Sequence, residues 1–171
     1  MRLIALIVAL IAASAPAAAQ SWTEYTYPED FFSVSFPTDP TKETTTYQTV
    51  DGRPVEARIY SASQDGSVFK MMVIDASGAS AAEKPVIDHA VKTLFPGGEV
   101  KLDIEHRISR IYGRQLSILG PDGSRSMAAL FYHNRRLYMI EGKALPTAAS
   151  GTADAIRFQQ SLVFTDDGTN R

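Results

Sequence analysis

The feature that most constrains the fold of this chain is a series of short runs in which apolar and polar residues alternate. Dipeptides that favour tight turns, Asp51-Gly52 and Asp65-Gly66, separate several of these runs. The runs in the first half of the chain cover residues 32–36, 44–50, 54–62 and 68–74. Alternation with a period of two is typical of strands, and Asp-Gly suits the positive φ angles of tight hairpins. The pattern therefore predicts antiparallel pairing along much of the chain.

The second half of the chain predicts one more alternating strand, which begins at Val100, and then a three-stranded meander. The meander strands are residues 110–119, 125–133 and 137–144. If the two loops have four and two residues, Leu119 lies opposite Ser124 and His133 lies opposite Arg136. This register predicts a core face made of Tyr112, Leu116, Ile118, Met127, Ala129, Phe131, Tyr138 and Ile140, with Arg114 on the same face.

Two segments have helical rather than strand-like spacing, at about 81–95 and about 152–162. Ser80 and Glu83 have the spacing of a capping box at the start of the first. The second presents one stripe made of Ala155, Ile156, Gln159 and Leu162. The expected fold class is α+β, with a mostly antiparallel meander sheet of about six to eight strands and two main helices packed on it.

The amino-terminal residues 1–19 have the pattern of a secretory signal peptide. Met1 and Arg2 precede the apolar run 3–13, and small residues precede Gln20. We therefore expect a signal peptide at 1–19, a single α+β domain at 20–164 and a flexible tail at 165–171. The expected location is periplasmic or secreted.

Composition excludes several classes of function. The chain has no cysteine, which excludes disulfides, and its net charge of −2 gives no general attraction to nucleic acid. No apolar run after residue 19 approaches the roughly 20 residues of a membrane span. We therefore expect neither nucleic-acid binding nor a membrane span after signal cleavage.

Motifs for catalysis, cofactors and metals are not recognisable. His89, His106 and His133 lack the spacing of zinc ligands, and no Gly-x-Ser-x-Gly elbow occurs. The carboxylates of Glu29 and Asp30 fall in a predicted loop, where solvated charge is the default. We therefore expect no catalytic, cofactor-binding or metal-binding residue, and the pattern favours a binding protein over an enzyme.

A cluster of arginines around Tyr112 is the group most suited to binding. Guanidinium groups recognise carboxylate or phosphate in a bidentate manner, although ordinary bridges to Asp103, Glu105 or Glu141 would also explain them. The face opposite the predicted core should meet water at its polar end. The candidate ligand or partner surface comprises Arg107, Arg110, Tyr112, Arg114, Gln115, Ser126 and Glu141.

Three aromatic residues, Trp22, Tyr25 and Tyr27, alternate imperfectly just after the predicted cleavage site. They are compatible with an edge strand that packs on the domain. They are also compatible with a mobile arm that docks on a partner.

The segment from Trp22 to Pro37 resembles the entry strand of the superfamily that includes the photosystem II accessory protein PsbP and the Ran-binding protein Mog1. The likeness lies in Trp22-x-x-Tyr25 and in the run 28–37, which contains Phe32-Ser33-Val34-Ser35-Phe36-Pro37. Phe31 stands where that family commonly has a turn glycine. The run 97–164 is similar to the second half of small uncharacterised exported proteins of proteobacteria.

This resemblance implies an accessory or scaffold protein that acts by binding and carries over no catalytic residue. The expected function is that of an exported, non-enzymatic accessory or binding protein of the cell envelope, with an unknown protein or envelope component as partner. Two alternatives remain open. One is a carrier of a small anionic ligand that uses the arginines around Tyr112, and the other is a hydrolase with an unrecognised site that includes His106.

Overall fold

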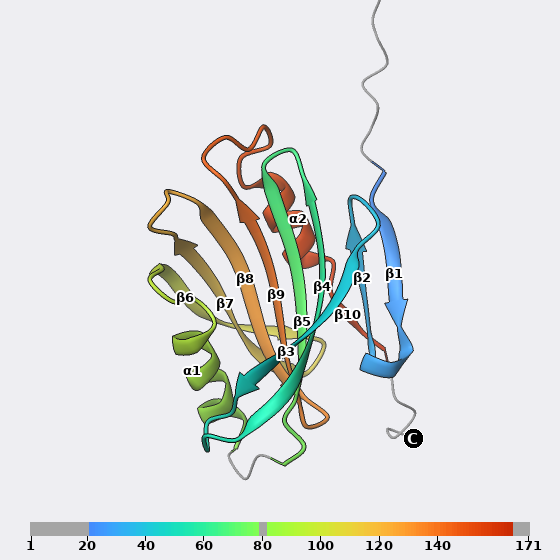
Figure 1. Ribbon diagram of the computed structural model, residues 1–171, viewed down its shortest axis with the longest axis vertical. Helices are drawn as coiled ribbons and strands as arrows, with labels where there is room; N and C mark the ends of the chain where they lie inside the picture. The colour runs from blue at the N-terminus through green and yellow to red at the C-terminus, as the bar shows by residue number, and fades with distance from the viewer. Residues whose placement is uncertain (1–20, 79–81, 166–171) are drawn as a thin grey trace, which may run out of the picture.

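A strongly twisted antiparallel sheet of seven strands forms the body of the molecule (Figure 1). The computed structural model describes residues 21–78 and 82–165. In spatial order the strands are β3 (Thr41–Gln48), β4 (Pro54–Gln64), β5 (Ser67–Asp75), β9 (Arg136–Ala144), β8 (Arg125–His133), β7 (Ile111–Leu119) and β6 (Glu99–Ile108). Every neighbouring pair is antiparallel. The predicted meander and α+β class are confirmed.

A small second sheet lies against one face of the large one (Figure 1). It consists of β1 (Thr23–Tyr27), β2 (Phe32–Phe36) and β10 (Val163–Phe164), with a short 3₁₀ helix, η1 (Pro28–Asp30), between β1 and β2. Because β1 pairs along its length with β2, Tyr25 and Tyr27 lie on an edge strand. Trp22 precedes this strand and packs against Phe69. Phe31 follows η1 with a φ of 57°, so a side chain occupies a left-handed turn position that glycine adopts more readily.

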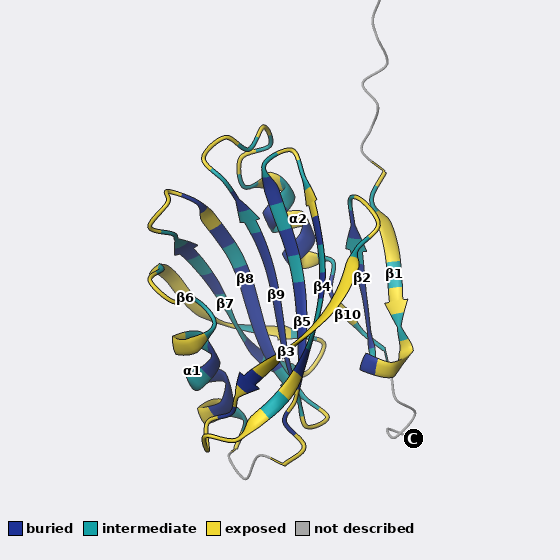
Figure 2. Cartoon of the chain, in the orientation of Figure 1, coloured by how far each residue is buried: buried dark blue, intermediate teal, exposed yellow. Residues whose placement is uncertain are grey.

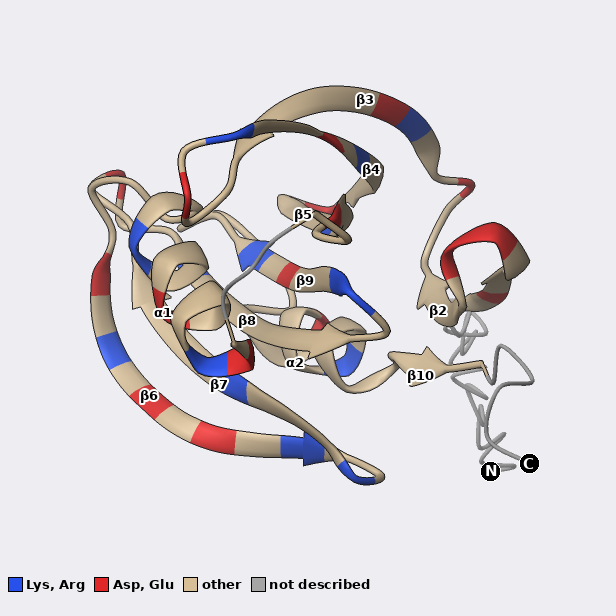
Figure 3. Cartoon of the chain, turned by 90° about the horizontal axis from the view of Figure 1, so that it is seen from below, with Lys and Arg blue, Asp and Glu red and all other residues tan. Residues whose placement is uncertain are grey.

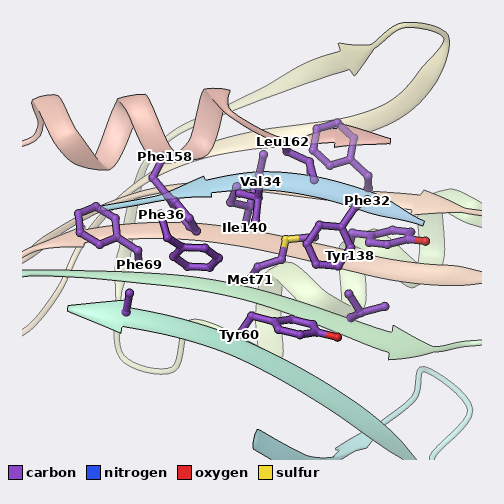
Figure 4. Packing of buried hydrophobic residues seen from close by; sticks show 14 residues of the cluster. Phe32, Val34, Phe36, Tyr60, Phe69, Met71, Tyr138, Ile140, Phe158 and Leu162 are labelled. Carbon is purple, nitrogen blue, oxygen red and sulfur yellow. The ribbon is translucent and has the colours of Figure 1, made fainter. Parts of the chain in front are cut away.

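Two helices cover opposite faces of the large sheet. Helix α1 (Glu83–Thr93) packs mainly on β8 from one side, and α2 (Ala153–Gln160) packs on β9, β8 and β5 from the other. Each face has its own apolar core, so the sheet is buried from both sides near its middle (Figure 2). The α2-side core also takes in Phe32, Val34 and Phe36 of β2 (Figure 4).

The predicted helices are present, with small differences at their ends and in one buried face. Helix α1 begins after Ala82, and Ser80 lies outside the described residues. In α2 the buried side chains include Phe158 rather than Ile156. The Phe158 ring lies 4.9 Å from that of Phe36 and 5.3 Å from that of Phe69, so the largest side chain of the helix fills the gap between the two sheets.

Helix α2 approaches the sheet closely because β9 has a glycine beneath it. A Cβ atom on Gly142 would lie 2.5 Å from the Cα atom of Ala155. No larger residue fits there without moving the helix. The pairing of Gly142 with Ala155 therefore fixes the distance between α2 and the sheet.

The predicted register between β7 and β8 is wrong by one residue. Leu119 pairs with Arg125 rather than Ser124, whereas the predicted pairing of His133 with Arg136 is confirmed. The loop is shorter than expected: Gly120 donates its N–H to the Ser124 carbonyl at 2.8 Å, and Gly123 has a φ of 77°. This is a three-residue hairpin with a bulge, and it turns every β7 side chain to the opposite face.

The corrected register changes the composition of both cores. Tyr112, Arg114, Leu116 and Ile118 face α1, together with Leu130 of β8. They do not share the α2-side face with Ala129, Phe131 and the other residues predicted beside them. No helix among residues 21–78 and 82–165 is long and apolar enough to cross a bilayer. The predicted signal peptide lies outside these residues.

Candidate protein-binding surface

Strand β6 is an edge strand that is exposed along most of its length. It pairs on one side with β7 and with no other strand among the described residues. Its apolar side chains Val100, Leu102 and Ile104 are 41%, 43% and 46% exposed. Figure 2 shows β6 as one of the most exposed strands of the sheet. An exposed edge that carries apolar side chains is a template for pairing with another chain.

The hairpin of β6 and β7, Glu99–Leu119, extends the sheet beyond its covered middle, and we call it the β6–β7 ribbon. Ile104 pairs with Gln115 and Leu102 pairs with Ser117, so these four side chains share one face. Gln115 in turn pairs with Ala129 of the α2-side core, which identifies this face as the α2 side. Because α2 packs over β9, β8 and β5, the α2 side of the ribbon lies beyond the helix.

The opposite face of the ribbon is tied to α1 by Arg114. Its Nε donates to Asp103 Oδ1 at 2.7 Å, its Nη2 donates to the second oxygen of Asp103, and its Nη1 donates to Asp88 of α1. The hydrogen bond to Asp103 is the main cause of a raised pKa for Arg114. Lys84 also donates to Asp88 and contributes most to lowering the pKa of that carboxyl. The contact between Arg114 and Asp103 is one of the cross-strand bridges that we considered as an alternative to ligand binding by these arginines.

The remaining arginines of the predicted surface lie near the open end of the ribbon. The Arg107 guanidinium lies 5.5 Å from the centre of the Tyr112 ring, within the range of a cation–π contact. Arg110 is exposed in the turn between β6 and β7, next to Ser109, which has a φ of 58°. Five of the seven predicted surface residues therefore lie on the ribbon: Arg107, Arg110, Tyr112, Arg114 and Gln115.

The other two predicted residues, Ser126 and Glu141, do not join this surface. They were expected at an open, water-facing end of the sheet, but they are only 6% and 8% exposed. Ser126 donates its hydroxyl to Glu141 Oε1 at 2.7 Å, and Lys70 Nζ lies 2.9 Å from Glu141 Oε2. Their burial separates them from the exposed residues of the ribbon. They face the α1 side, as Tyr112 and Arg114 do, whereas Gln115 faces the α2 side. The predicted register, which is wrong by one residue, placed Gln115 on the same face as Ser126 and Glu141.

A shallow cleft of about 220 Å³ lies beside this buried carboxylate. Leu94, Phe95 and Pro96 after α1 form one wall, and Lys70, Glu141 and Lys143 lie on the sheet side. Both lysines already have carboxylate partners, since Lys143 Nζ lies 3.2 Å from Asp122. The cleft therefore holds paired charges rather than a free acid, base or cation.

A buried ionic cluster around Asp30 was missed in the sequence. Asp30 is 0% exposed, although its position in a loop predicted a solvated carboxylate. Arg58 Nε donates to both carboxylate oxygens at 2.9 and 3.0 Å, and the Tyr60 hydroxyl donates to Oδ2 at 2.7 Å. Tyr138 donates its hydroxyl to the Asp30 carbonyl at 3.0 Å. The sequence did contain one indication of this cluster. Arg58 and Tyr60 lie two residues apart in an alternating run, so they share one face of the strand and could bind the same carboxylate.

The cluster is suited to holding the two sheets together. Burial alone would raise the pKa of Asp30, but the hydrogen bonds from Arg58 and Tyr60 outweigh it and lower the pKa below its ordinary value. Burial raises the pKa of Tyr138 to about 12. Asp30 therefore stays ionised and Tyr138 stays protonated at neutral pH. Their partners lie on β4 and on η1, so the cluster connects the large sheet to the small one.

The surroundings of the histidines bear on metal binding and on the hydrolase alternative. Within residues 21–78 and 82–165 no group of three or more His, Asp or Glu side chains could hold a metal ion. The imidazole of His106 lies 5.7 Å from the Phe131 ring, and His89 Nε2 lies 3.0 Å from the Gln48 carbonyl oxygen. His106, the residue on which the hydrolase alternative depends, therefore contacts an aromatic ring of the core.

Comparison with known proteins gives information on the fold. No family model matches the chain, and no curated protein matches it. Among solved structures, it is similar to the cyanobacterial PsbP (CyanoP) of Synechocystis sp. PCC 6803, with a TM-score of 0.57 and 8% identity over 90% of this chain and 98% of that one. A second match, to a protein of unknown function and putative regulator from Pseudomonas aeruginosa, has a TM-score of 0.41 and 14% identity, and covers 79% of this chain and 90% of that one.

The likeness to the cyanobacterial protein extends over nearly the whole of both chains, but at 8% identity it concerns the fold alone. It agrees with the entry-strand pattern at Phe32–Phe36, which forms β2. It also agrees with an antiparallel sheet that lies between two helices. The chain therefore has a PsbP-like α+β fold.

Proposed function

We propose that the chain is an exported, non-enzymatic accessory protein of the cell envelope that acts by binding another protein through the β6–β7 ribbon. The observation that carries this proposal is the exposure of Leu102 and Ile104, at 43% and 46%, on an edge strand. Burying such side chains against a partner contributes roughly 25 cal/mol per Å² of apolar area. The free edge offers backbone hydrogen bonds as well.

Two other features support protein binding over the alternatives. Arg114, the most enclosed of the arginines around Tyr112, already binds Asp103 and Asp88 and is not free for an anionic ligand. The cleft beside Glu141 likewise contains lysines that are paired. In contrast, the α2 side of the ribbon presents apolar and amide side chains that lie beyond the covering helix.

The pattern of residues 1–19 supports export. An apolar run of about eleven residues after Arg2, followed by small residues before Gln20, is the arrangement that signal peptidases recognise. The test is the mass of the amino-terminal peptide of protein recovered from the envelope fraction of expressing bacteria. A peptide that starts at Gln20 supports export, and a retained Met1 in the cytosolic fraction contradicts it.

Site-specific photo-crosslinking tests the binding surface. A photoreactive amino acid is introduced in place of Ile104 on β6 or, as a matched control, in place of Thr44 on β3. Both side chains are exposed and lie on edge strands. Irradiation of intact cells should give a protein adduct from position 104 and none from position 44. The proposal fails if position 104 gives no protein adduct, or if both positions give the same set of adducts.

A further inference from the structure

We infer that the protein at the free edge of β6 is a second copy of this chain, paired with β6 across a two-fold axis. This inference rests on the proposed function, because it identifies the partner of the same edge. The chemistry of the edge is the reason for choosing a second copy. Its apolar and charged side chains are arranged so that the strand is complementary to itself when it is reversed.

The geometry of β6 limits the pairing to one full overlap. The pairing with β7 shifts between Val100 and Leu102, which is a bulge at Lys101. At the other end the strand stops at Ile108, before Ser109 turns with a positive φ. The regular run is therefore Leu102–Ile108, and Glu105 is its middle residue. A two-fold axis at Glu105 pairs the whole run with itself in antiparallel orientation, as an isologous dimer requires.

This register places apolar side chains together on the α2 side. Leu102 of one copy lies opposite Ile108 of the other, and Ile104 lies opposite His106. Leu102 and Ile104 are exposed, whereas His106 and Ile108 are only partly exposed and lie against the α2-side core. Cross-strand pairs that involve apolar or aromatic side chains stabilise sheets by about 0.2–1 kcal/mol each. The two ribbons then form a continuous apolar surface on the α2 side, centred on the axis.

The charges on the α1 side also match in this register. Asp103 of one copy, which already accepts hydrogen bonds from Arg114 of its own copy, lies opposite Arg107 of the other. Arg107 is diagonal to the partner copy's Glu105, within reach of a long side chain. Figure 3 shows acidic and basic residues interspersed along β6, with two acidic residues in succession before the last basic one. The two Glu105 side chains meet at the axis, where the nearby guanidinium groups offset their repulsion.

Neighbouring registers are less favourable. An axis at Ile104 places Asp103 opposite Glu105, a like-charge pair on both sides of the axis. An axis at His106 leaves Leu102 beyond the turn of the other copy. An axis at Asp103 requires regular pairing across the bulge at Lys101. The full overlap at Glu105 alone combines apolar contacts with opposite charges.

A single cysteine at the axis tests this register. The chain contains no cysteine, so Glu105→Cys gives one thiol per copy. Directly opposed Cα atoms in an antiparallel pair lie about 4.5–5.5 Å apart, which is within the range for a disulfide. Oxidised glutathione should therefore convert most of the Glu105→Cys protein to a covalent dimer, visible by non-reducing electrophoresis.

Two matched cysteines serve as controls. Leu102→Cys lies on the same strand, but the two copies of position 102 are six residues apart along the pair, about 20 Å. Thr44→Cys lies on the β3 edge. Neither should form the covalent dimer at more than a tenth of the Glu105→Cys yield. Equal yields from all three positions would mean random collision and would overturn the inference.

Light scattering on the unmodified chain gives an independent readout. The mass should rise from that of one copy to that of two as concentration increases, and Ile104→Lys should shift this transition to at least tenfold higher concentration. A monomer at every concentration, with no Glu105→Cys dimer, overturns self-pairing. If position 104 then still crosslinks to a different protein, the proposed function stands and only the identity of the partner is wrong. If it crosslinks to nothing, both fail.

Discussion

The middle of the sheet and the β6–β7 ribbon have similar strand patterns but opposite environments. Strands β5, β9 and β8 are covered by α1 on one side and by α2 and the small sheet on the other, so that even Glu141 is buried. Strand β6 carries apolar residues at Val100, Leu102 and Ile104 that no described element covers to the same extent. The core of this protein therefore differs from its candidate binding surface in whether helices and the small sheet cover the strands, rather than in the composition of the strands.

A matched pair of isoleucines gives the largest contrast. Ile140 on β9 is 0% exposed and Ile104 on β6 is 46% exposed. Ile140→Ala should lower the free energy of unfolding by about 2–5 kcal/mol, because it leaves a cavity in the core. Ile104→Ala should lower it by less than about 1 kcal/mol. Urea denaturation of both variants, at a protein concentration where the chain is monomeric, measures these losses. Equal losses of unfolding free energy would contradict the difference in burial between the two positions.

The Asp30 cluster should be the most costly polar group to disrupt in the covered region. Asp30→Asn leaves Arg58 without its buried carboxylate partner, with only the exposed Glu56 remaining, and should lower the free energy of unfolding by about 3 kcal/mol. Tyr60→Phe removes one hydrogen bond to the same carboxylate and should cost about 1 kcal/mol. Thermal unfolding measures both, and an Asp30→Asn loss no larger than that of Tyr60→Phe would contradict a structural role for the charge.

The same cluster predicts the sign of a pH effect. The folded pKa of Asp30 lies below its ordinary value of 3.8, so the unfolded chain binds more protons as pH falls. The stability that Asp30 contributes is fully present well above pH 3.8 and is lost below it. Asp30→Asn should therefore show a weaker loss of stability between about pH 5 and pH 3 than the unmodified chain. A parallel pH dependence of the two proteins would contradict this cause.

Gly113 joins the ribbon to the covered region and gives an intermediate effect. A Cβ atom there would lie 2.3 Å from Phe131 Cδ1 and 2.4 Å from the Leu130 carbonyl oxygen. Gly113→Ala should therefore lower the free energy of unfolding by about 2 kcal/mol, through crowding against the core. Ser117→Ala, on the same strand as Gly113, serves as the control. A neutral Gly113→Ala would mean that the ribbon is free to move away from β8.

Arg114 should have the smallest effect on global stability and a clear local one. Lysine cannot reproduce the bidentate contact with Asp103, and the site is partly exposed, so Arg114→Lys should cost about 1 kcal/mol or less. Hydrogen exchange should become faster in β6 and β7 and stay unchanged in β5 and β9. Uniform acceleration across all four strands would show that Arg114 supports the whole sheet rather than the ribbon.

Much of the fold could be predicted because it depends on local pattern. The alternation at Phe32–Phe36, the Asp-Gly hairpins and the helical spacing around Ile87 each reflect chemistry within a few residues. The β7–β8 register could not be predicted in the same way. The residues Gly120–Gly123 are compatible both with a four-residue loop and with a three-residue loop that contains a bulge. One residue of difference moved Arg114 and Leu116 to the other face.

The candidate site was predictable only in part for the same reason. Five of its seven predicted residues lie on the β6–β7 ribbon because they are close in sequence on one hairpin. Ser126 and Glu141 were misplaced because their burial depends on Lys70 and on the segment after α1, which are distant in the chain. Asp30 was missed because its partner Arg58 lies in another sheet. Exposure of β6 depends on what the helices leave uncovered, which no local pattern encodes.

Hydrogen exchange of the full chain at two protein concentrations tests directly whether β6 is a binding edge that pairs with a second copy. The amides of Leu102–Ile108 that point away from β7 should exchange quickly in dilute solution and be protected at least tenfold in concentrated solution. The free-edge amides of Thr41–Gln48 should keep the same rate at both. Rates for β6 that do not change with concentration, or that change together with those of β3, would contradict the account.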